Sequence, residues 1–199
     1  ARYRALATWC RQRGLAALAT GHQLDDQAET LLMRLNRGSG LAGLAGVRAR
    51  GSVPGSELPL LRPLLDWRRM ELAAVVEAAG LAAAQDASNH DLRFDRVRIR
   101  RALGAADWLE AEGIARSAAH LAEAESFIDE QIAEIERARL RAVEGGFALA
   151  PPASDFAAVE LCGRIIAKLD GTARRSEVAT LVARLRRGDS ASLGGVLAR

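Results

Sequence analysis

Hydrophobic residues recur at helical spacing along most of the chain, and the strand-like runs are few and short. Ala28, Leu31, Leu32 and Leu35 stand at i, i+3, i+4 and i+7, which is the spacing of one buried helix face. The apolar run 15–19 just before them is typical of a short buried strand. Periodicity, caps and glycines together predict helices over residues 2–13, 26–37, 67–79, 93–101, 107–143, 154–169 and 174–187.

Glycine-rich and proline-rich segments separate these helices. Residues 38–43 (GSGLAG) fit the GxGxxG pattern, but they follow a predicted helix, whereas a dinucleotide-binding loop follows a strand. We therefore reject a Rossmann site and expect a helix cap and a tight loop. Residues 51–59 are typical of a loop, residues 60–65 of a short strand or extended segment, and residues 193–199 of a strand cut short. Because the chain opens with a helix rather than a strand, we expect an N-terminal part to be missing.

The helix predicted over residues 67–79 has recognisable ends. Asp66 is expected to cap it, and Gly80 to end it. A polar turn should follow at residues 86–91. The apolar residues expected on its buried face are Leu72, Val75, Val76 and Ala79.

The composition fits one or two globular domains and excludes several kinds of site. The chain has 199 residues, 49% of them hydrophobic, which is ample for a core. Its net charge of +3 permits nucleic-acid binding without requiring it. Nearly every basic residue is arginine, and Lys168 is the only lysine. Arginine suits phosphate contacts, but a GC-rich genome would produce the same bias. Aromatics at 4% argue against a base-stacking surface. Cys10 and Cys162 are far apart in sequence and belong to no Cys/His cluster, so we predict no zinc or iron–sulfur site. This cysteine usage fits a reducing compartment, and we predict a cytoplasmic protein.

The segment 21–30 (GHQLDDQAET) concentrates acidic side chains between the predicted strand and helix, which is where ligands bind in open α/β sheets. If it is helical, Asp26 and Glu29 share one face, with Cβ atoms about 5–6 Å apart. Two such carboxylates can hold Mg²⁺ through water or bind an ammonium group, and His22 can carry a proton. The alternative is a capping box formed by Asp26 and Glu29, which would need neither His22 nor Asp25. Spacing alone leaves both interpretations open.

Arginines form a second cluster. Arg93, Arg96 and Arg100 stand at i, i+3 and i+7, which places them on one stripe of a helix, with Arg98 and Arg101 beside it. Such a concentration of like charge favours anion binding, but a solvated helix face would look the same.

These motifs resemble those of one known family. The run GHQLDDQAETLLMRLNRGSGLAGLAG is similar to the GHxxDDxxET segment of tRNA(Ile)-lysidine synthetases, which belong to the N-type ATP pyrophosphatase (PP-loop) superfamily. LRPLLDWRRMEL, DASNHD and RFDRVRIRRAL resemble later landmarks of that family in the same order. The resemblance implies an α/β, predominantly helical chain. Residues 1–106 would be the remnant of a parallel-sheet, nucleotide α-hydrolase-like PP-loop domain, and residues 107–199 a long connecting helix and an all-α, tRNA-contacting domain.

The same resemblance implies a reaction. ATP adenylates the wobble cytidine of tRNA(Ile) with anticodon CAU at C2, and the ε-amine of free lysine then displaces AMP. It implies ATP and Mg²⁺, tRNA and lysine as partners, and a homodimer. By motif, the catalytic residues are His22, Asp26 and Glu29; the substrate- and nucleotide-binding residues are Asp25, Arg62, Asn89, Arg96 and Arg100; the RNA-binding residues are Arg93, Arg98 and Arg101.

Two departures from the family pattern affect these expectations. The ATP-binding loop SGGxDS does not occur in these 199 residues, so we expect them not to catalyse the reaction by themselves. Val97 stands where many members have Asn, and the resemblance thins after residue 110. A thiolating relative is disfavoured because Cys10 and Cys162 do not fit. A non-catalytic, arginine-rich RNA-binding or structural domain is the remaining alternative.

Overall fold

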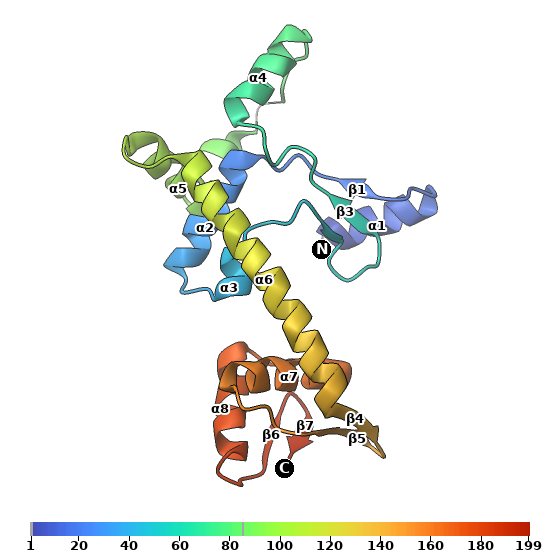
Figure 1. The fold of residues 1–199 in the computed structure, drawn as a ribbon. Coiled ribbons are helices and arrows are strands. Elements are labelled where there is room, and N and C mark those ends of the chain that lie inside the picture. The colour runs from blue at the N-terminus through green and yellow to red at the C-terminus, as the bar shows by residue number, and fades with distance from the viewer. Residues whose placement is uncertain (1, 85) are drawn as a thin grey trace. The chain divides into compact units, whose positions relative to one another are not determined.

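The computed structural model describes residues 2–84 and 86–199, and the chain divides into two compact units, Ala1–Glu125 and Ser126–Arg199. Helices predominate over short strands, which confirms the predicted fold class (Figure 1). No described helix is long and apolar enough to cross a membrane. The elements are α1 (Arg2–Gln12), β1 (Leu18–Ala19), α2 (Leu24–Asn36), α3 (Leu41–Leu44), β2 (Arg50–Ser52), β3 (Pro59–Leu61), α4 (Arg69–Ala78), η1 (Ala87–His90), α5 (Asp95–Ala105), α6 (Ala111–Arg139), β4 (Leu140–Val143), β5 (Gly146–Leu149), α7 (Asp155–Lys168), α8 (Arg175–Leu185), β6 (Ala191–Leu193) and β7 (Val196–Ala198).

A three-stranded sheet lies in the first unit. β1 pairs in parallel with β3, and β2 pairs with β3 in the antiparallel direction. Leu60 of β3 is 1% exposed and packs with Val53 and with Ala7 of α1. The strand predicted over residues 15–19 was wrong for its first three residues, because only Leu18 and Ala19 pair with β3. Gly51 and Ser52 of β2 were wrongly assigned to a loop, because the polar sequence of β2 has no strand pattern and only its pairing with β3 makes it a strand.

The start of α2 is a capping box. The Gln23 side chain accepts the Asp25 main-chain N–H at 2.6 Å, and Asp26 Oδ2 accepts the Gln23 N–H at 3.0 Å. The alternative cap predicted from Asp26 and Glu29 was therefore wrong by three residues. Glu29 lies inside the helix and is buried, whereas Leu35, expected on the buried face, is 57% exposed.

Segments between α2 and α5 correct several details of the predictions. Residues 38–43 form a helix end and the one-turn α3, and they follow a helix rather than a strand, as expected. α4 begins at residue 69 with Arg68 as its cap, so Asp66 is not the cap, and none of the residues of α4 is buried. The predicted buried face of α4 was wrong, because Leu72 and Val76 are only partly buried, Ala79 is exposed and Val75 is 53% exposed. Arg93 precedes α5 and so does not share its stripe with Arg96 and Arg100.

The second unit combines helices with two hairpins, β4–β5 and β6–β7, so the expectation of an all-α second domain was wrong. α7 and α8 form its core, which includes Leu161, Val178 and Leu181, and the part of α6 around Ile132 packs on α7. The helix predicted to reach residue 143 ends at Arg139, because the last four residues pair with β5. The final segment is the hairpin of β6 and β7 rather than the beginning of a cut strand.

We predict that Gly194→Ala destabilises the second unit. Gly194 has φ +60, and an added Cβ would lie 2.7 Å from the Thr172 carbonyl oxygen. The left-handed conformation alone costs an L-residue about 1–2 kcal/mol, and the close contact adds to it. Urea unfolding should show a lower midpoint. The matched control is Gly163→Ala within α7, where the space is open and helix propensity favours Ala by about 1 kcal/mol. Equal effects of the two substitutions would contradict the prediction.

Candidate active site

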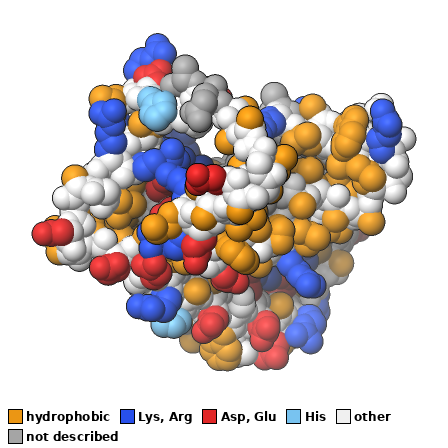
Figure 2. Space-filling view, turned by 90° about the horizontal axis from the view of Figure 1, so that it is seen from above, with side chains coloured by type: hydrophobic (Ala, Val, Ile, Leu, Met, Phe, Trp, Pro, Cys, Tyr) orange, Lys and Arg blue, Asp and Glu red, His pale blue; other side chains and the backbone are white. Residues whose placement is uncertain are grey.

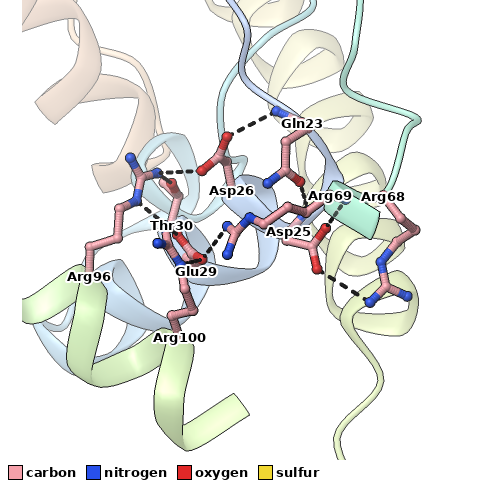
Figure 3. Close-up of polar contacts among 9 residues, drawn as sticks. All are labelled: Gln23, Asp25, Asp26, Glu29, Thr30, Arg68, Arg69, Arg96 and Arg100. Carbon is pink, nitrogen blue, oxygen red and sulfur yellow. Dashed lines mark hydrogen bonds and ion pairs between the residues drawn. The ribbon is translucent and has the colours of Figure 1, made fainter. Parts of the chain in front are cut away.

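Glu29 is the centre of a buried ion-pair cluster. Its side chain is 1% exposed and its two carboxylate oxygens face three guanidinium groups. Arg69 Nη2 donates to Oε1 at 2.9 Å, Arg100 Nε donates to Oε1 at 2.7 Å, and Arg96 Nε lies 3.0 Å from Oε2. These arginines come from α4 and α5, so Glu29 joins three helices that are distant in sequence (Figure 3).

Asp25 fixes the start of α4 on the start of α2. Asp25 Oδ2 accepts the main-chain N–H of Arg69 at 2.8 Å, and Oδ1 lies 3.3 Å from Arg68 Nη2. Arg68 also donates to Glu112 of α6. Burial by itself raises the pKa of Asp25, but the hydrogen bonds from Arg69 and Arg68 hold it below its usual value. Asp25 is therefore charged near neutral pH and serves to hold the two helices together.

Asp26 differs from its two acidic neighbours because it faces a cavity. One oxygen accepts the Gln23 N–H, and the other lies 3.8 Å from Arg96 Nη2, a distance at which the ion pair is loose. Its side chain is 16% exposed. Asp26 is thus oriented by the cap while keeping an oxygen available for a ligand.

His22 lies beside this cluster in a partly buried position. Its Nδ1 is 2.9 Å from Thr20 Oγ1. Burial lowers the pKa of His22, Asp26 opposes this shift, and the charges of Arg62 and Arg96 add to it. The imidazole is consequently neutral at pH 7, the form that can accept a proton.

A cavity of about 580 Å³ opens in the first unit. Among the described residues, Asp26 is its only acidic lining residue, and basic side chains gather around a hollow on this face of the molecule (Figure 2). The lining residues are Gly21, Gln23, Asp26, Arg69, Asn89, His90, Val97, Arg100 and Arg101. An excess of guanidinium groups over carboxylates makes this cavity attractive to anions.

The structure gathers some of the predicted site residues and separates others. Asp26, Asn89, Arg100 and Arg101 line the cavity, while Glu29 and Arg96 form the ion pairs next to it. Arg62 donates to the Arg48 carbonyl at 2.6 Å and acts on the site through the pKa of His22. The remaining arginines pair locally in exposed positions: Arg93 with Asp91, and Arg98 with Asp95.

Three residues of the cluster were missed from the sequence. Gln23 is the helix cap, and Arg68 and Arg69 bring α4 onto the acidic segment. The signal available was the Arg-Arg pair inside LRPLLDWRRMEL, one of the family landmarks. Nothing in its spacing shows that it meets carboxylates about forty residues earlier.

The acidic residues do not form a metal centre by themselves. No group of three or more His, Cys, Asp and Glu side chains suited to a metal occurs within the described residues. The pair of carboxylates considered from the sequence is divided: Glu29 is occupied by arginines, and Asp26 alone faces the cavity. No step is therefore assigned to a metal held by these side chains.

The first unit thus carries an anion-attracting cavity at the N-terminus of α2. A family model described as PP-loop domain matches residues 1–106, and the chain belongs to this family. The names of individual relatives are more specific than the description of the family. The chain is 48% identical to the tRNA(Ile)-lysidine synthase of Novosphingobium aromaticivorans over 98% of the chain and 61% of the relative. It is 42% identical to that of Zymomonas mobilis over 70% and 43%, and 37% identical to that of Ruegeria pomeroyi over 99% and 49%.

These relatives confirm the resemblance found in the motifs. The chain spans about three fifths or less of the length of the relatives it matches. The match to the Novosphingobium protein covers the helical second unit as well as the PP-loop match.

Proposed function

We propose that the protein acts in ATP-dependent ligation of lysine to C2 of the wobble cytidine of tRNA(Ile) with anticodon CAU, through an adenylated tRNA intermediate. The observation that carries this proposal is the cavity in which Asp26 meets a group of arginines, built by the motifs that the chain shares with its relatives. The names of those relatives support a ligase, and nothing favours the non-catalytic alternative.

Each residue of the cluster has a role in this proposal. Asp26 and His22 are the groups that act on the attacking lysine amine: Asp26 binds its ammonium form, and His22 accepts the proton that it must lose. Glu29 positions Arg96 and Arg100, whose charge stabilises anionic groups of the nucleotide and the RNA. Asn89 and Arg101, which line the cavity, are assigned to substrate contact.

ATP and Mg²⁺ are assigned by the same reasoning. The arginine-lined cavity suits the negative charge of a nucleotide. Mg²⁺ would be carried with the phosphates, because the described side chains offer it no ligand set. We assign residues 1–106 to the PP-loop domain and residues 107–199 to a connecting helix and a tRNA-contacting domain. Arg93, just before α5, and Arg98, within α5, are exposed and are assigned to RNA contacts. The homodimer and the cytoplasmic location remain predictions.

The fate of the AMP group tests this function. The whole protein is incubated with ATP labelled in its α-phosphate and with tRNA(Ile). Without lysine, label should accumulate on the tRNA, and adding lysine should release it as AMP. A tRNA with uridine at the wobble position should take up no label. Label release that needs neither the tRNA nor lysine would contradict the proposal.

The pKa of His22 gives a further prediction. Burial lowers this pKa, so the folded protein resists protonation below the ordinary value of 6.5. An NMR titration should place the His22 midpoint below 6.5, and the acid limb of kcat/KM should follow it. Because the unfolded chain takes up this proton at higher pH, the free energy of unfolding should fall as pH drops from 6.5 towards the lowered pKa.

Arg62→Met provides the check on this assignment. The charge of Arg62 lowers the pKa of His22, so removing it should move the midpoint upward. Exposed Arg50→Met, on β2, should leave the midpoint unchanged. A midpoint above 6.5 in the wild-type protein would refute the neutral imidazole at this position.

A further inference from the structure

Arg69 lines the cavity with a positive charge that has so far been given only the structural role of holding α4 on the acidic segment. It is the first residue of α4, lines the cavity, and has a side chain that is 40% exposed. Its one side-chain hydrogen bond among the described residues runs from Nη2 to Glu29. A guanidinium has five N–H donors in a planar fork, so most of the donors of Arg69 remain for a ligand.

The position of Arg69 is fixed before any ligand arrives. Its main-chain N–H is held by Asp25 at 2.8 Å, and the Leu24 N–H donates to the Trp67 carbonyl at 2.9 Å. Arg68, the cap of α4, is held by Asp25 and Glu112. The start of α4 is thus bound to the start of α2, and the Arg69 side chain extends from there towards Glu29 (Figure 3).

Neutralising Glu29 does not require Arg69. Arg96 and Arg100 already place two positive charges against that one carboxylate. The cavity itself is lined by three guanidinium groups, those of Arg69, Arg100 and Arg101, and by one carboxylate, that of Asp26, so its lining has two more positive than negative charges. Arginines brought together in this way repel one another unless an anion lies among them.

We propose that Arg69 binds a phosphate group of a substrate in this cavity. Arg100 and Arg101 are the neighbours of Arg69 there, and Glu29 positions the Arg69 side chain. Phosphate is the anion that matches the planar fork of arginine, which can bind it through two parallel hydrogen bonds. The phosphate can come from the nucleotide or from the RNA backbone. The choice between these sources rests on the proposed function, whereas phosphate binding itself does not.

Binding measurements on the whole protein test this role. The probes are inorganic pyrophosphate and an anticodon stem-loop RNA, and the variants are Arg69→Ala, Arg69→Lys and, as a control, exposed Arg11→Ala on α1. Loss of a hydrogen bond to a charged group weakens binding by about 10- to 100-fold, so Arg69→Ala should show this loss for at least one probe. If the RNA is the source, the salt dependence of its binding should also fall by about 0.7–0.9 in slope. Arg11→Ala should bind both probes as the wild type does.

Arg69→Lys separates binding from folding. Lysine keeps a positive charge for Glu29 but lacks the fork, so the variant should fold and still bind the sensitive probe several-fold more weakly. Arg69 is a structural ion-pair partner only, and the inference is overturned, if both variants bind both probes within about twofold of wild type, whatever their stability. The proposed function is tested separately. If pyrophosphate binding depends on Arg69 but the protein does not ligate lysine, the phosphate site is kept and the proposed ligase function is rejected. If the protein ligates lysine but the Arg69 variants bind both probes as the wild type does, the ligase function is kept and the phosphate site is rejected.

Discussion

Asp26→Asn should reduce lysine ligation by at least about 100-fold while leaving the protein folded. Asp26 binds the lysine ammonium in the proposed reaction, and an amide cannot form that ion pair. Removing one partner of a buried charge pair costs about 3–5 kcal/mol, which corresponds to a loss of at least about 100-fold. The substitution keeps an oxygen at the position of Oδ2, which accepts the Gln23 N–H, so the cap of α2 should survive. Steady-state ligation kinetics measure the loss, and thermal unfolding checks the fold.

The control for this variant is Asp66→Asn. Asp66 also lies just before a helix and is exposed, but it neither caps α4 nor lines the cavity. It should ligate lysine at the wild-type rate. Ligation by Asp26→Asn at the rate of Asp66→Asn would remove Asp26 from the chemistry.

Glu29→Gln should destabilise the first unit by about 3 kcal/mol. Removing one partner of a buried ion pair costs about 3–5 kcal/mol, because the opposite charges stay behind without compensation. Here three guanidinium groups would be left facing one another, and the lower end of that range applies because each is about one third exposed and can regain water. Against a total stability of about 5–15 kcal/mol, this is a large fraction. Urea unfolding measures it.

Glu77→Gln on α4 is the matched control. Glu77 is exposed, and its loss of charge should change the free energy of unfolding by no more than about 0.5 kcal/mol. Glu29→Gln should also weaken ligation, since Arg96 and Arg100 lose the group that aligns them. A Glu29→Gln protein as stable as the Glu77→Gln protein would show that the three ion pairs contribute nothing to folding.

Local signals predicted those parts of the fold that depend on neighbours in sequence. The helix expected to end near Arg37 and the helix expected to begin near Ser154 were found because caps, glycines and apolar spacing act within a few residues. β2 was missed because Arg-Gly-Ser becomes a strand only through pairing with β3. The apolar face of α4 was mispredicted for the opposite reason: its spacing is that of a buried helix, but none of the residues of α4 is fully buried.

The candidate site shows the same division. The motif identified Asp26 and Glu29, and helical spacing placed them on one face. The sequence could not show that three arginines occupy Glu29 while Asp26 faces the cavity, because those arginines come from 40, 67 and 71 residues further along the chain. Nor could it show that Arg93 stops short of α5. Asp25, Asp26 and Glu29 differ in their roles because they form different ion pairs with residues distant in sequence, and such ion pairs leave no local pattern in the sequence.

Mass spectrometry of the wobble nucleoside tests the central claim most directly. The whole protein, with ATP and lysine, should convert cytidine at that position of tRNA(Ile) to lysidine, and the Asp26→Asn protein should leave it as cytidine. Cytidine left unmodified by the wild-type protein, or lysidine formed at the same rate by the variant, would contradict an active site built on Asp26 and its arginines.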